Sequence, residues 1–344
     1  MAGRLTLMFT GPGRVEVVAR EGGGDDDGGP GAPAPPGQVL VRTLASAISA
    51  GTELLAFRGQ IPPGTALDET LGALAGGTFA YPFRYGYAAV GEVAAVGAGV
   101  DAAWRGRRVF AFEPHATAFT AAPADLVAVP DGLAPERAAL LAHMETAVNL
   151  VLDGAPLVGE EVLVIGQGTV GLLATALLAR FPLARLTVCE PLPLRASAAR
   201  ALGARHVAAS ADDAVRAVGA RGADLVFELS GDPAALDLAI AAAGHEARIV
   251  VGSWYGGKRA AVNLGGRFHR RRQRLVSSQV SRIAPGLSAR WDRERRFGVA
   301  WNALAEIDTL PLVSHRFPFA DAQAAYELID RHPERVLQVL LAYG

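Results

Sequence analysis

The sequence Val162-Leu-Val-Ile-Gly166-Gln-Gly168-Thr-Val-Gly171 joins a short apolar run to the glycine spacing G-x-G-x-x-G. The apolar run predicts a buried strand, and the residues after it predict a helix that continues to about Arg180. Between a strand and a helix, Gly166 makes a tight turn, Gly168 lets a pyrophosphate approach the backbone, and Gly171 lets the helix pack closely. The helix N-terminus adds N–H groups and partial positive charge for the phosphates. The expected cofactor-binding residues of this turn are Gly166, Gln167, Gly168, Thr169, Val170 and Gly171.

A carboxylate follows the turn at the spacing that dinucleotide binding requires. A second apolar run, residues 186–189, predicts the next strand, and Glu190 comes directly after it, 19 residues beyond Gly171. A carboxylate at about this distance accepts hydrogen bonds from the adenosine ribose hydroxyls and repels a 2′-phosphate. The sequence therefore favours NAD over NADP.

From about residue 160 onward, strands and helices alternate. Such alternation predicts a parallel sheet covered by helices on both faces, which is a doubly wound α/β fold. Further strands are predicted at 207–208, 224–228, 248–251 and 275–280, with helices at about 193–202 and 233–243. We expect the strand at 275–280 to form the edge of the sheet.

The first 150 residues follow a different pattern. Short β-like runs separated by Gly and Pro predict strands at 15–18, 39–42, 90–96 and 108–112, and a helix is predicted over 135–152. The Gly-, Asp- and Pro-rich residues 21–37 predict a surface loop. The tail from about 290 predicts two helices and a last strand at 336–341.

Composition narrows the class of protein. A chain of 344 residues predicts about two domains, and a net charge of −1 gives no general attraction to nucleic acid or to a membrane surface. Cys189 is the one cysteine, so neither an intrachain disulfide nor a cysteine-rich zinc site is possible. We find no signal peptide and no apolar run of membrane-spanning length, and we expect a cytoplasmic protein.

The order of these parts resembles the medium-chain dehydrogenase/reductase superfamily. The resemblance covers nearly the whole chain and rests on 41–42, 51–53, 86–93, 106–109, 202–204, 222–228 and the glycine turn. Residues 49–53 and 268–279 look most like the bacteriochlorophyllide dehydrogenase branch and related zinc-binding alcohol dehydrogenases. The resemblance implies a β-rich GroES-like catalytic domain formed by 1–150 and 291–344, a Rossmann domain over 151–290, and a homodimer that pairs the edge strand across a two-fold axis.

The metal ligands of this superfamily are missing. Zinc-dependent members carry Cys-Gly-Thr-Asp-x-His where residues 50–55 read Ala-Gly-Thr-Glu-Leu-Leu, and Tyr87 replaces a ligand histidine. The third ligand falls near Leu141 or Ala142, neither of which coordinates metal. Because a catalytic zinc needs three protein ligands, we predict no metal. An alternative set from His115, His143 and Glu145 matches no known spacing.

Without zinc, charge on the substrate oxygen needs hydrogen-bond donors or a general acid. Thr52 occupies the proton-relay hydroxyl position of the superfamily, and Tyr87 offers a phenol in the same cleft. Glu53 aligns with the carboxylate that orients the replaced histidine, so we hypothesise that Glu53 orients Tyr87. The alternative is that Tyr87 only fills the vacated metal site.

Other polar and aromatic residues leave two interpretations open. Lys258, the only lysine, is a candidate for proton transfer or a surface residue, and Thr146 is a possible cofactor contact. Glu113, His115, His143 and Glu145 either supply a base with its orienting partner or have structural roles. Trp254, Tyr255 and the aromatic residues 79, 81, 83 and 85 either line a pocket for a bulky or planar substrate or pack in the core. The basic run 267–274 either binds an acidic substrate or forms a solvated edge.

The sequence thus predicts a zinc-independent, NAD(H)-dependent oxidoreductase that interconverts a secondary alcohol and a ketone. One alternative is a zinc-free quinone or enone reductase, which Glu190 disfavours because such relatives usually prefer NADPH. Another is an NAD(H)-binding sensor without catalysis. We expect a small-molecule substrate and no nucleic-acid partner, because the basic run has no docking motif beside it.

Overall fold

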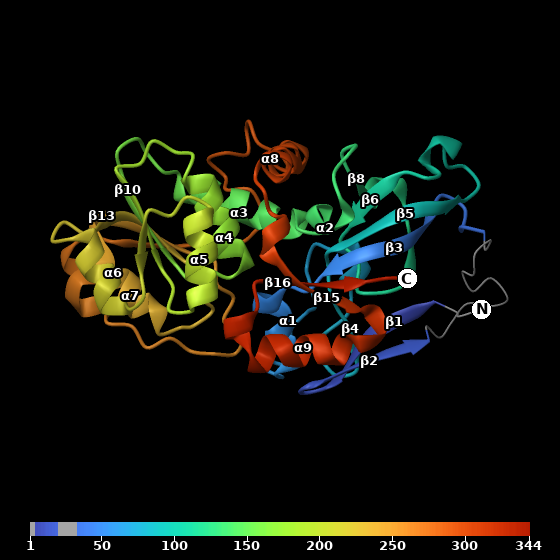
Figure 1. Ribbon diagram of the computed structural model, residues 1–344, viewed down its shortest axis with the longest axis horizontal. Coiled ribbons are helices and arrows are strands. Elements are labelled where there is room, and N and C mark those ends of the chain that lie inside the picture. The colour runs from blue at the N-terminus through green and yellow to red at the C-terminus, as the bar shows by residue number, and fades with distance from the viewer. Residues whose placement is uncertain (1–3, 20–32) are drawn as a thin grey trace. The chain divides into compact units, whose positions relative to one another are not determined.

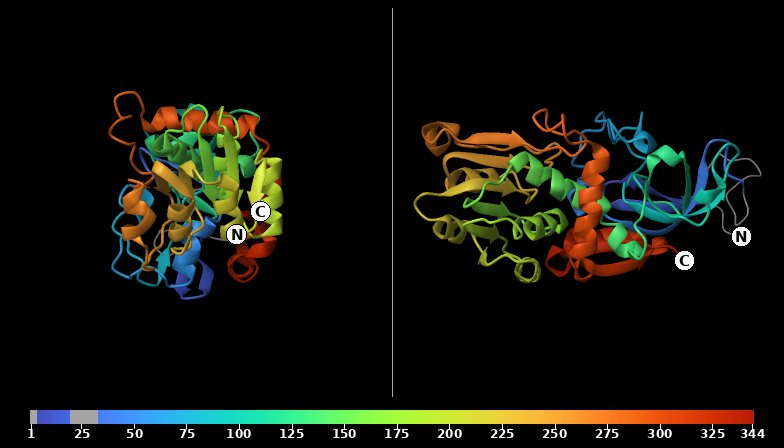
Figure 2. Two further views of the ribbon diagram at one scale, coloured as in Figure 1. Left: turned by 90° about the vertical axis from the view of Figure 1, so that its left-hand side faces the viewer. Right: turned by 90° about the horizontal axis from the view of Figure 1, so that it is seen from above.

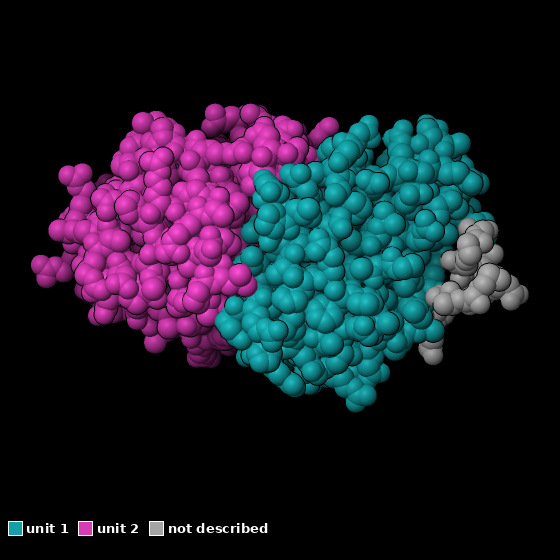
Figure 3. Space-filling model, in the orientation of Figure 1, with its two compact units in different colours: residues 1–142, 308–344 teal, residues 143–307 magenta. Residues whose placement is uncertain are grey.

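A computed structural model describes residues 4–19 and 33–344, and most of the predicted surface loop over 21–37 lies outside these residues. The chain divides into two compact units: unit 1 comprises residues 1–142 and 308–344, and unit 2 comprises residues 143–307 (Figure 3). The predicted boundary at 150 falls inside helix α3 (Leu141–Gly154). The boundary predicted at 290 precedes α8 (Arg293–Glu306), which belongs to unit 2 because its buried Arg296 pairs with Glu145 of α3.

Unit 2 is built on a six-stranded parallel sheet in the order β11-β10-β9-β12-β13-β14 (Figure 1). This is the strand order of the doubly wound dinucleotide-binding fold, as the sequence predicts. The strands are β9 (Glu161–Ile165), β10 (Arg185–Cys189), β11 (His206–Ala208), β12 (Ala223–Glu228), β13 (Ala243–Val251) and β14 (Arg274–Ser277). Strand β14 lies at the edge of the sheet, which confirms that expectation.

Helices cover this sheet because successive strand residues point to opposite faces. Leu163, Ile165 and Val226 pack into one cluster with Ala214 of α6 (Ala211–Val218) and Ile240 of α7 (Ala235–Ala242). Helices α4 (Thr169–Leu178) and α5 (Pro193–Ala201) lie together on the other side of the strands (Figure 1).

Unit 1 holds a seven-stranded sheet and a three-stranded sheet (Figures 1 and 2). The larger sheet runs β15-β16-β3-β5-β6-β8, with β7 also paired to β3, and the smaller runs β2-β1-β4. The strands are β1 (Leu5–Gly11), β2 (Arg14–Ala19), β3 (Val39–Ala47), β4 (Phe83–Arg84), β5 (Ala89–Val96), β6 (Arg108–Ala111), β7 (Ala118–Ala121), β8 (Leu126–Ala128), β15 (Val313–Pro318) and β16 (Gln338–Ala342). The fold class, a Rossmann unit with a separate β-rich unit, is as predicted.

The C-terminal segment completes unit 1. Strand β16 pairs antiparallel with β3, with Leu340 opposite Ala47. Helix α9 (Ala322–Arg331) packs against α1 (Ala50–Phe57) through a core that contains Phe9, Phe57 and Tyr326. These contacts bring residues near both ends of the chain beside α1, which carries two of the predicted site residues.

Two local differences from the sequence predictions stand out. The helix predicted over 135–152 is two helices, α2 (Pro135–Ala138) and α3, and the predicted strand 275–280 ends at Ser277. Within the described ranges, we find no helix with the length and apolar character needed to span a membrane.

Candidate active site

Two glycines of the turn after β9 are required by the fold itself. Gly166 has a φ of +88°, and a Cβ there would lie 2.6 Å from Cα of Ser230. A Cβ on Gly171 would lie 2.2 Å from the carbonyl oxygen of Gly166. Both distances are far below van der Waals contact, so only glycine fits, as the helix–strand packing argument predicts.

Gly168 differs from these two. It is the N-cap of α4, with a φ of −67° that any residue adopts. A Cβ at this position would meet no protein atom within 4 Å. The backbone is therefore open on this side, and it fits the phosphate cradle that a dinucleotide needs beside a helix N-terminus.

The side chain of Gln167 is buried and forms hydrogen bonds within the protein. Its Nε2 donates to the carbonyl of Gly166 at 3.1 Å, and its Oε1 accepts from Thr175 at 2.9 Å. Its backbone N–H donates to Oε2 of Glu190 at 2.8 Å. Gln167 thus stabilises the turn that leads into α4, whose first residues are Thr169 and Val170.

Glu190 lies beside the glycine turn, at the carboxyl end of β10. Besides the bond from Gln167, its Oε1 accepts the backbone N–H of Leu192 at 2.9 Å. The side chain is 4% exposed, so both bonds fix its position. Burial lowers the pKa of Arg195, and the nearby negative charge of Glu190 opposes this lowering.

Three hydroxyls meet in unit 1 around the predicted residue Tyr87. The Tyr87 hydroxyl donates to Oγ of Ser49 at 2.5 Å and contacts Oγ1 of Thr52 at 3.1 Å. Ser49 is the N-cap of α1, Thr52 lies in its first turn, and Tyr87 lies between β4 and β5. We call Ser49, Thr52 and Tyr87 the hydroxyl cluster. Burial, reinforced by the charge of Glu53, raises the pKa of Tyr87 to about 12, so its phenol is neutral at physiological pH.

Glu53 anchors this cluster from behind. Its buried carboxylate accepts the Ser49 backbone N–H at 2.7 Å through Oε1. Oε2 contacts Nε2 of His115 at 3.0 Å and accepts a bond from the Tyr326 hydroxyl. Glu53 therefore orients Tyr87 through Ser49, whereas the sequence hypothesis had the two residues in direct relation.

The anchor extends further through His115. Its Nδ1 contacts Oγ of Ser46 at 2.7 Å, and the same hydroxyl contacts the Tyr343 hydroxyl at 2.7 Å. Sequence reasoning missed Ser46, Ser49 and these tyrosines. Ser46 and Ser49 interrupt an otherwise apolar stretch over 44–50, which is a weak sign of a buried polar role. Tyr326 and Tyr343 are nearly 300 residues from their partners and carry no such sign.

The positions aligned with zinc ligands do not fit a metal. Ala50, Leu141 and Ala142 have no ligand atom, and both ring nitrogens of His115 already have partners. Over residues 4–19 and 33–344, no three His, Cys, Asp or Glu side chains gather in a metal-binding group.

Glu145 belongs to a buried ion pair in unit 2. Arg296 donates to its Oε1 from Nη2 at 2.6 Å and from Nε at 3.1 Å, and reaches Oδ1 of Asn149 at 2.6 Å. Burial raises the pKa of Glu145 against the opposing charge of Arg296. These contacts favour the structural interpretation of Glu145. Thr146 on the same helix is the partly exposed position among ten otherwise buried residues, 141–150.

Of the remaining candidates, some are placed near the carboxyl ends of the parallel strands and others pack in a core. Lys258 donates from Nζ to the carbonyl of Gly231 at 3.2 Å, beyond the carboxyl end of β12, and the Tyr255 hydroxyl donates to Glu228. Trp254 is 42% exposed. The aromatic rings of the 60–85 segment pack in the core of unit 1 against Phe9 and one another; they are Phe79, Tyr81, Phe83 and Tyr85.

Comparison with known proteins places these features in context. The zinc-binding dehydrogenase family matches residues 169–292. The sorbitol dehydrogenase of Bacillus subtilis is 28% identical over 303 residues, which cover 76% of this chain and 81% of that protein. A short chain alcohol dehydrogenase of Escherichia coli, solved with NADH, superposes with a TM-score of 0.78 at 19% identity over 99% of this chain and 100% of that one. A zinc-binding dehydrogenase of Sinorhizobium meliloti bound to NADP superposes with a TM-score of 0.75 at 18% identity, over 99% of this chain and 100% of that one.

Proposed function

We propose that this chain, which matches the zinc-binding dehydrogenase family over residues 169–292 and resembles the medium-chain dehydrogenase/reductase superfamily, interconverts a secondary alcohol and a ketone with NAD(H) and without zinc. The observation that carries the proposal is the hydroxyl cluster, which joins Tyr87 and Thr52, the positions that the sequence resemblance pairs with a zinc ligand and with a proton-relay hydroxyl. Two of the proteins named above are a sorbitol dehydrogenase and an alcohol dehydrogenase, which supports the reaction class.

The cofactor part of the proposal rests on Gly168 and Glu190. A bound nicotinamide would supply or accept the hydride. Gly168 leaves the backbone open for the pyrophosphate, and Thr146 is a further candidate contact on α3. The Glu190 carboxylate has acceptor sites beyond the two backbone bonds that hold it, and its charge disfavours a 2′-phosphate. These features support NAD(H) over NADP(H).

The hydroxyl cluster supplies the chemistry that a metal would otherwise provide. In ketone reduction, negative charge grows on the substrate oxygen, and preorganised donors stabilise it. In the proposed reaction the neutral phenol of Tyr87 turns its single O–H from Oγ of Ser49 to that oxygen. The Thr52 hydroxyl, which both donates and accepts, passes a proton to the oxygen while taking one from water. Glu53 is a positioning residue, because it holds the Ser49 backbone rather than the phenol. Lys258 stays a predicted second donor.

The aromatic residues 79, 81, 83 and 85 do not support a bulky or planar substrate, because they lie in the core of unit 1. The edge strand β14 of the six-stranded sheet supports the further proposal that the protein forms a homodimer. Strand β14 presents an unpaired edge, and Leu275 on it is 39% exposed. We expect light scattering on the purified protein to give the mass of a dimer, and a monomer would contradict pairing through β14.

Metal content and cofactor preference test the proposal without a known substrate. Purified protein is analysed for bound metal, and NADH and NADPH are titrated by fluorescence. We expect no stoichiometric zinc and tighter binding of NADH. Glu190→Gln should reduce the preference for NADH, whereas Glu246→Gln, a surface carboxylate of the same unit, should leave it unchanged. Stoichiometric zinc or a strong NADPH preference would overturn the proposal.

Turnover distinguishes the remaining alternatives. Secondary alcohols, ketones, enones and quinones are each offered with the cofactor that binds. We expect turnover of alcohol–ketone pairs that falls in Tyr87→Phe. Reduction of enones or quinones alone would identify a C=C or quinone reductase. NADH binding with no turnover would identify a sensor, for which Thr52, Tyr87 and Lys258 are dispensable.

A further inference from the structure

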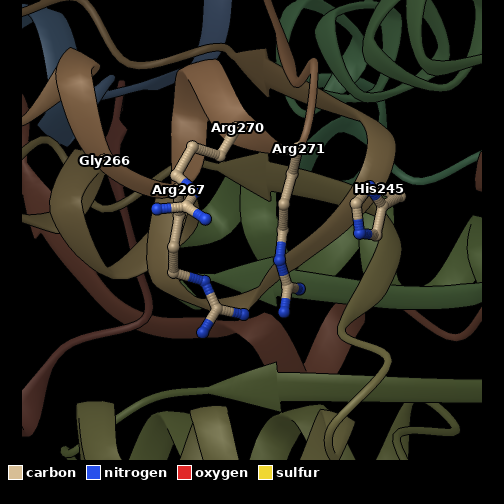
Figure 4. Close-up of a pocket in the computed structure, with 5 residues that line it drawn as sticks. All are labelled: His245, Gly266, Arg267, Arg270 and Arg271. Carbon is tan, nitrogen blue, oxygen red and sulfur yellow. The ribbon is translucent and has the colours of Figure 1, made fainter.

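An arginine-lined cavity lies in unit 2 and includes part of the basic run 267–274. It has a volume of about 360 Å³ and is lined by His245, Gly266, Arg267, Arg270 and Arg271 (Figure 4). Of the described residues that line it, none is acidic. Figure 4 shows the Arg267 and Arg271 side chains extending in the same direction, with the imidazole of His245 beside Arg271.

The cavity lies at the edge of the sheet opposite the glycine turn. His245 is the third residue of β13, and Arg270 and Arg271 come just before β14 begins. Both strands run parallel with β9, whose carboxyl end leads into Gly166. Amino ends and carboxyl ends of parallel strands lie at opposite edges, so a ligand here is neither the dinucleotide nor its substrate.

Hydrogen bonds hold the guanidinium group of Arg271 in place. Arg271 donates from Nη1 to the carbonyls of Ala243 at 3.3 Å and Arg221 at 3.5 Å. The neighbouring Gln273 is buried and donates from Nε2 to the same Ala243 carbonyl at 2.9 Å, which fixes the segment. Neither bond of Arg271 neutralises its charge, and most of its N–H donors remain available.

Charge compensation is missing inside the cavity but present just outside it. Burial and the nearby charge of Arg271 lower the pKa of Arg267. Arg272 in the same segment has a carboxylate partner, Glu246, at 3.3 Å. The lining arginines therefore repel one another, and an anion placed between them would relieve that repulsion.

We propose that this cavity binds a small phosphate-bearing dianion. Planar guanidinium groups donate paired hydrogen bonds to phosphate oxygens, and the imidazole of His245 adds a further donor. The volume, about 360 Å³, lies within the range of small-molecule sites and exceeds what one phosphate group needs. Pyrophosphate is the simplest probe of this chemistry.

Calorimetric titration of pyrophosphate into the full chain at low salt tests the proposal. We expect saturable binding that weakens by about tenfold or more in the double variant Arg267→Ala/Arg271→Ala. Arg272→Asn is the matched control, because it removes a charge from the same segment outside the cavity and asparagine tolerates its φ of +53°. The control should change the affinity by less than about threefold.

A second variant separates this cavity from the glycine turn, which would also attract pyrophosphate. Gly168→Asp places a negative charge in that turn and should leave binding to the arginine cavity unchanged. Binding that disappears in Gly168→Asp and persists in the double variant would overturn the proposal. Equal loss in Arg272→Asn would do so too, since only general positive charge would then be at work.

Folding of the variants is checked by thermal unfolding without ligand. The double variant loses the Arg271 bonds to backbone carbonyls, and if this destabilises it, a second double variant, Arg267→Gln/Arg270→Gln, replaces it in the same titration. The side chains of Arg267 and Arg270 are exposed, so their substitution leaves those bonds in place. We expect the same weakening there, and unchanged affinity would refute the site.

Discussion

Alanine at Gly168 and at Gly171 should act in opposite ways on stability and cofactor binding. The two glycines are three residues apart in one turn, and sequence alone assigns both to the same motif. In the structure, a Cβ at Gly171 would lie 2.2 Å from the Gly166 carbonyl, whereas a Cβ at Gly168 would meet nothing within 4 Å. One glycine is thus required by the fold, and the other leaves space for a ligand.

The sizes of the two effects follow from these distances. At Gly171 the clashing atom is backbone of a residue that is itself confined by Ser230, so neither side can retreat. Overpacking of this kind costs about 1–3 kcal/mol or more. At about 2–4 °C per kcal/mol, we expect the melting temperature of Gly171→Ala to fall by about 2–12 °C.

At Gly168 two small effects nearly cancel. Alanine gains about 0.4–1 kcal/mol from the less flexible unfolded chain, and it loses a similar amount as a poor N-cap residue. The melting temperature should therefore stay nearly constant. The added methyl group occupies the open side of the backbone, so we expect NADH to bind about tenfold more weakly or worse.

Thermal unfolding and NADH fluorescence titration of both variants give the answer. Gly298→Ala is the control: this glycine lies inside helix α8 of the same unit with no atom within 4 Å of its would-be Cβ. Alanine there should stabilise the protein by about 0.5–1 kcal/mol and leave NADH binding unchanged. The reasoning is refuted if Gly168→Ala lowers the melting temperature as much as Gly171→Ala, or if it leaves NADH affinity intact.

Three further outcomes are expected. Glu53→Ala leaves the donors around it without their buried acceptor, so the free energy of unfolding measured in urea should fall by about 3–5 kcal/mol. The control Glu69→Ala removes an exposed carboxylate and should lower it by less than about 0.5 kcal/mol. Tyr87→Phe keeps the ring and removes the donor, so kcat should fall by about 10²–10³-fold with NADH affinity unchanged. Because burial raises the pKa of Tyr87 to about 12, the reduction rate of the wild-type protein should show no loss from ionisation of this phenol between pH 7 and 10. Cys189 is buried with its pKa raised to about 11, so a thiol reagent at pH 8 should label it only after unfolding; rapid labelling of the native protein would contradict its placement in β10.

The Rossmann unit was predictable because its evidence is local. The apolar run 162–165, the glycine spacing and Glu190 lie within 30 residues of one another, and each has a direct structural consequence. Helix α6 was missed because it has only eight residues, three of them charged, and because its start depends on a cap in which the Ser210 hydroxyl oxygen accepts the Asp213 N–H. The break between α2 and α3 likewise has no proline or glycine to mark it.

The anchor behind the hydroxyl cluster could not be predicted in the same way. Its members come from β3, from α1, from the segment before β7 and from the last 20 residues of the chain. The alignment to zinc-binding relatives identified Thr52, Glu53 and Tyr87 as positions, but it could not show that Ser49 stands between Glu53 and Tyr87. Only the pairing of β16 with β3 and of α9 with α1 brings Tyr343 and Tyr326 to this place.

This anchor also bears on the direction of the reaction. A metal beside an alcohol stabilises its alkoxide, which favours removal of the proton during oxidation. The charge of Glu53 acts in the opposite sense, because it raises the pKa of the Tyr87 phenol and makes ionisation of a neighbouring hydroxyl harder. A neutral phenol that keeps its proton stabilises charge on the substrate oxygen as a hydrogen-bond donor, and it does so in reduction and in oxidation alike, because the two pass through the same states in opposite order. We infer that the proton added in reduction, or removed in oxidation, passes between the substrate oxygen and water through the Thr52 hydroxyl, so the proposed site favours neither direction.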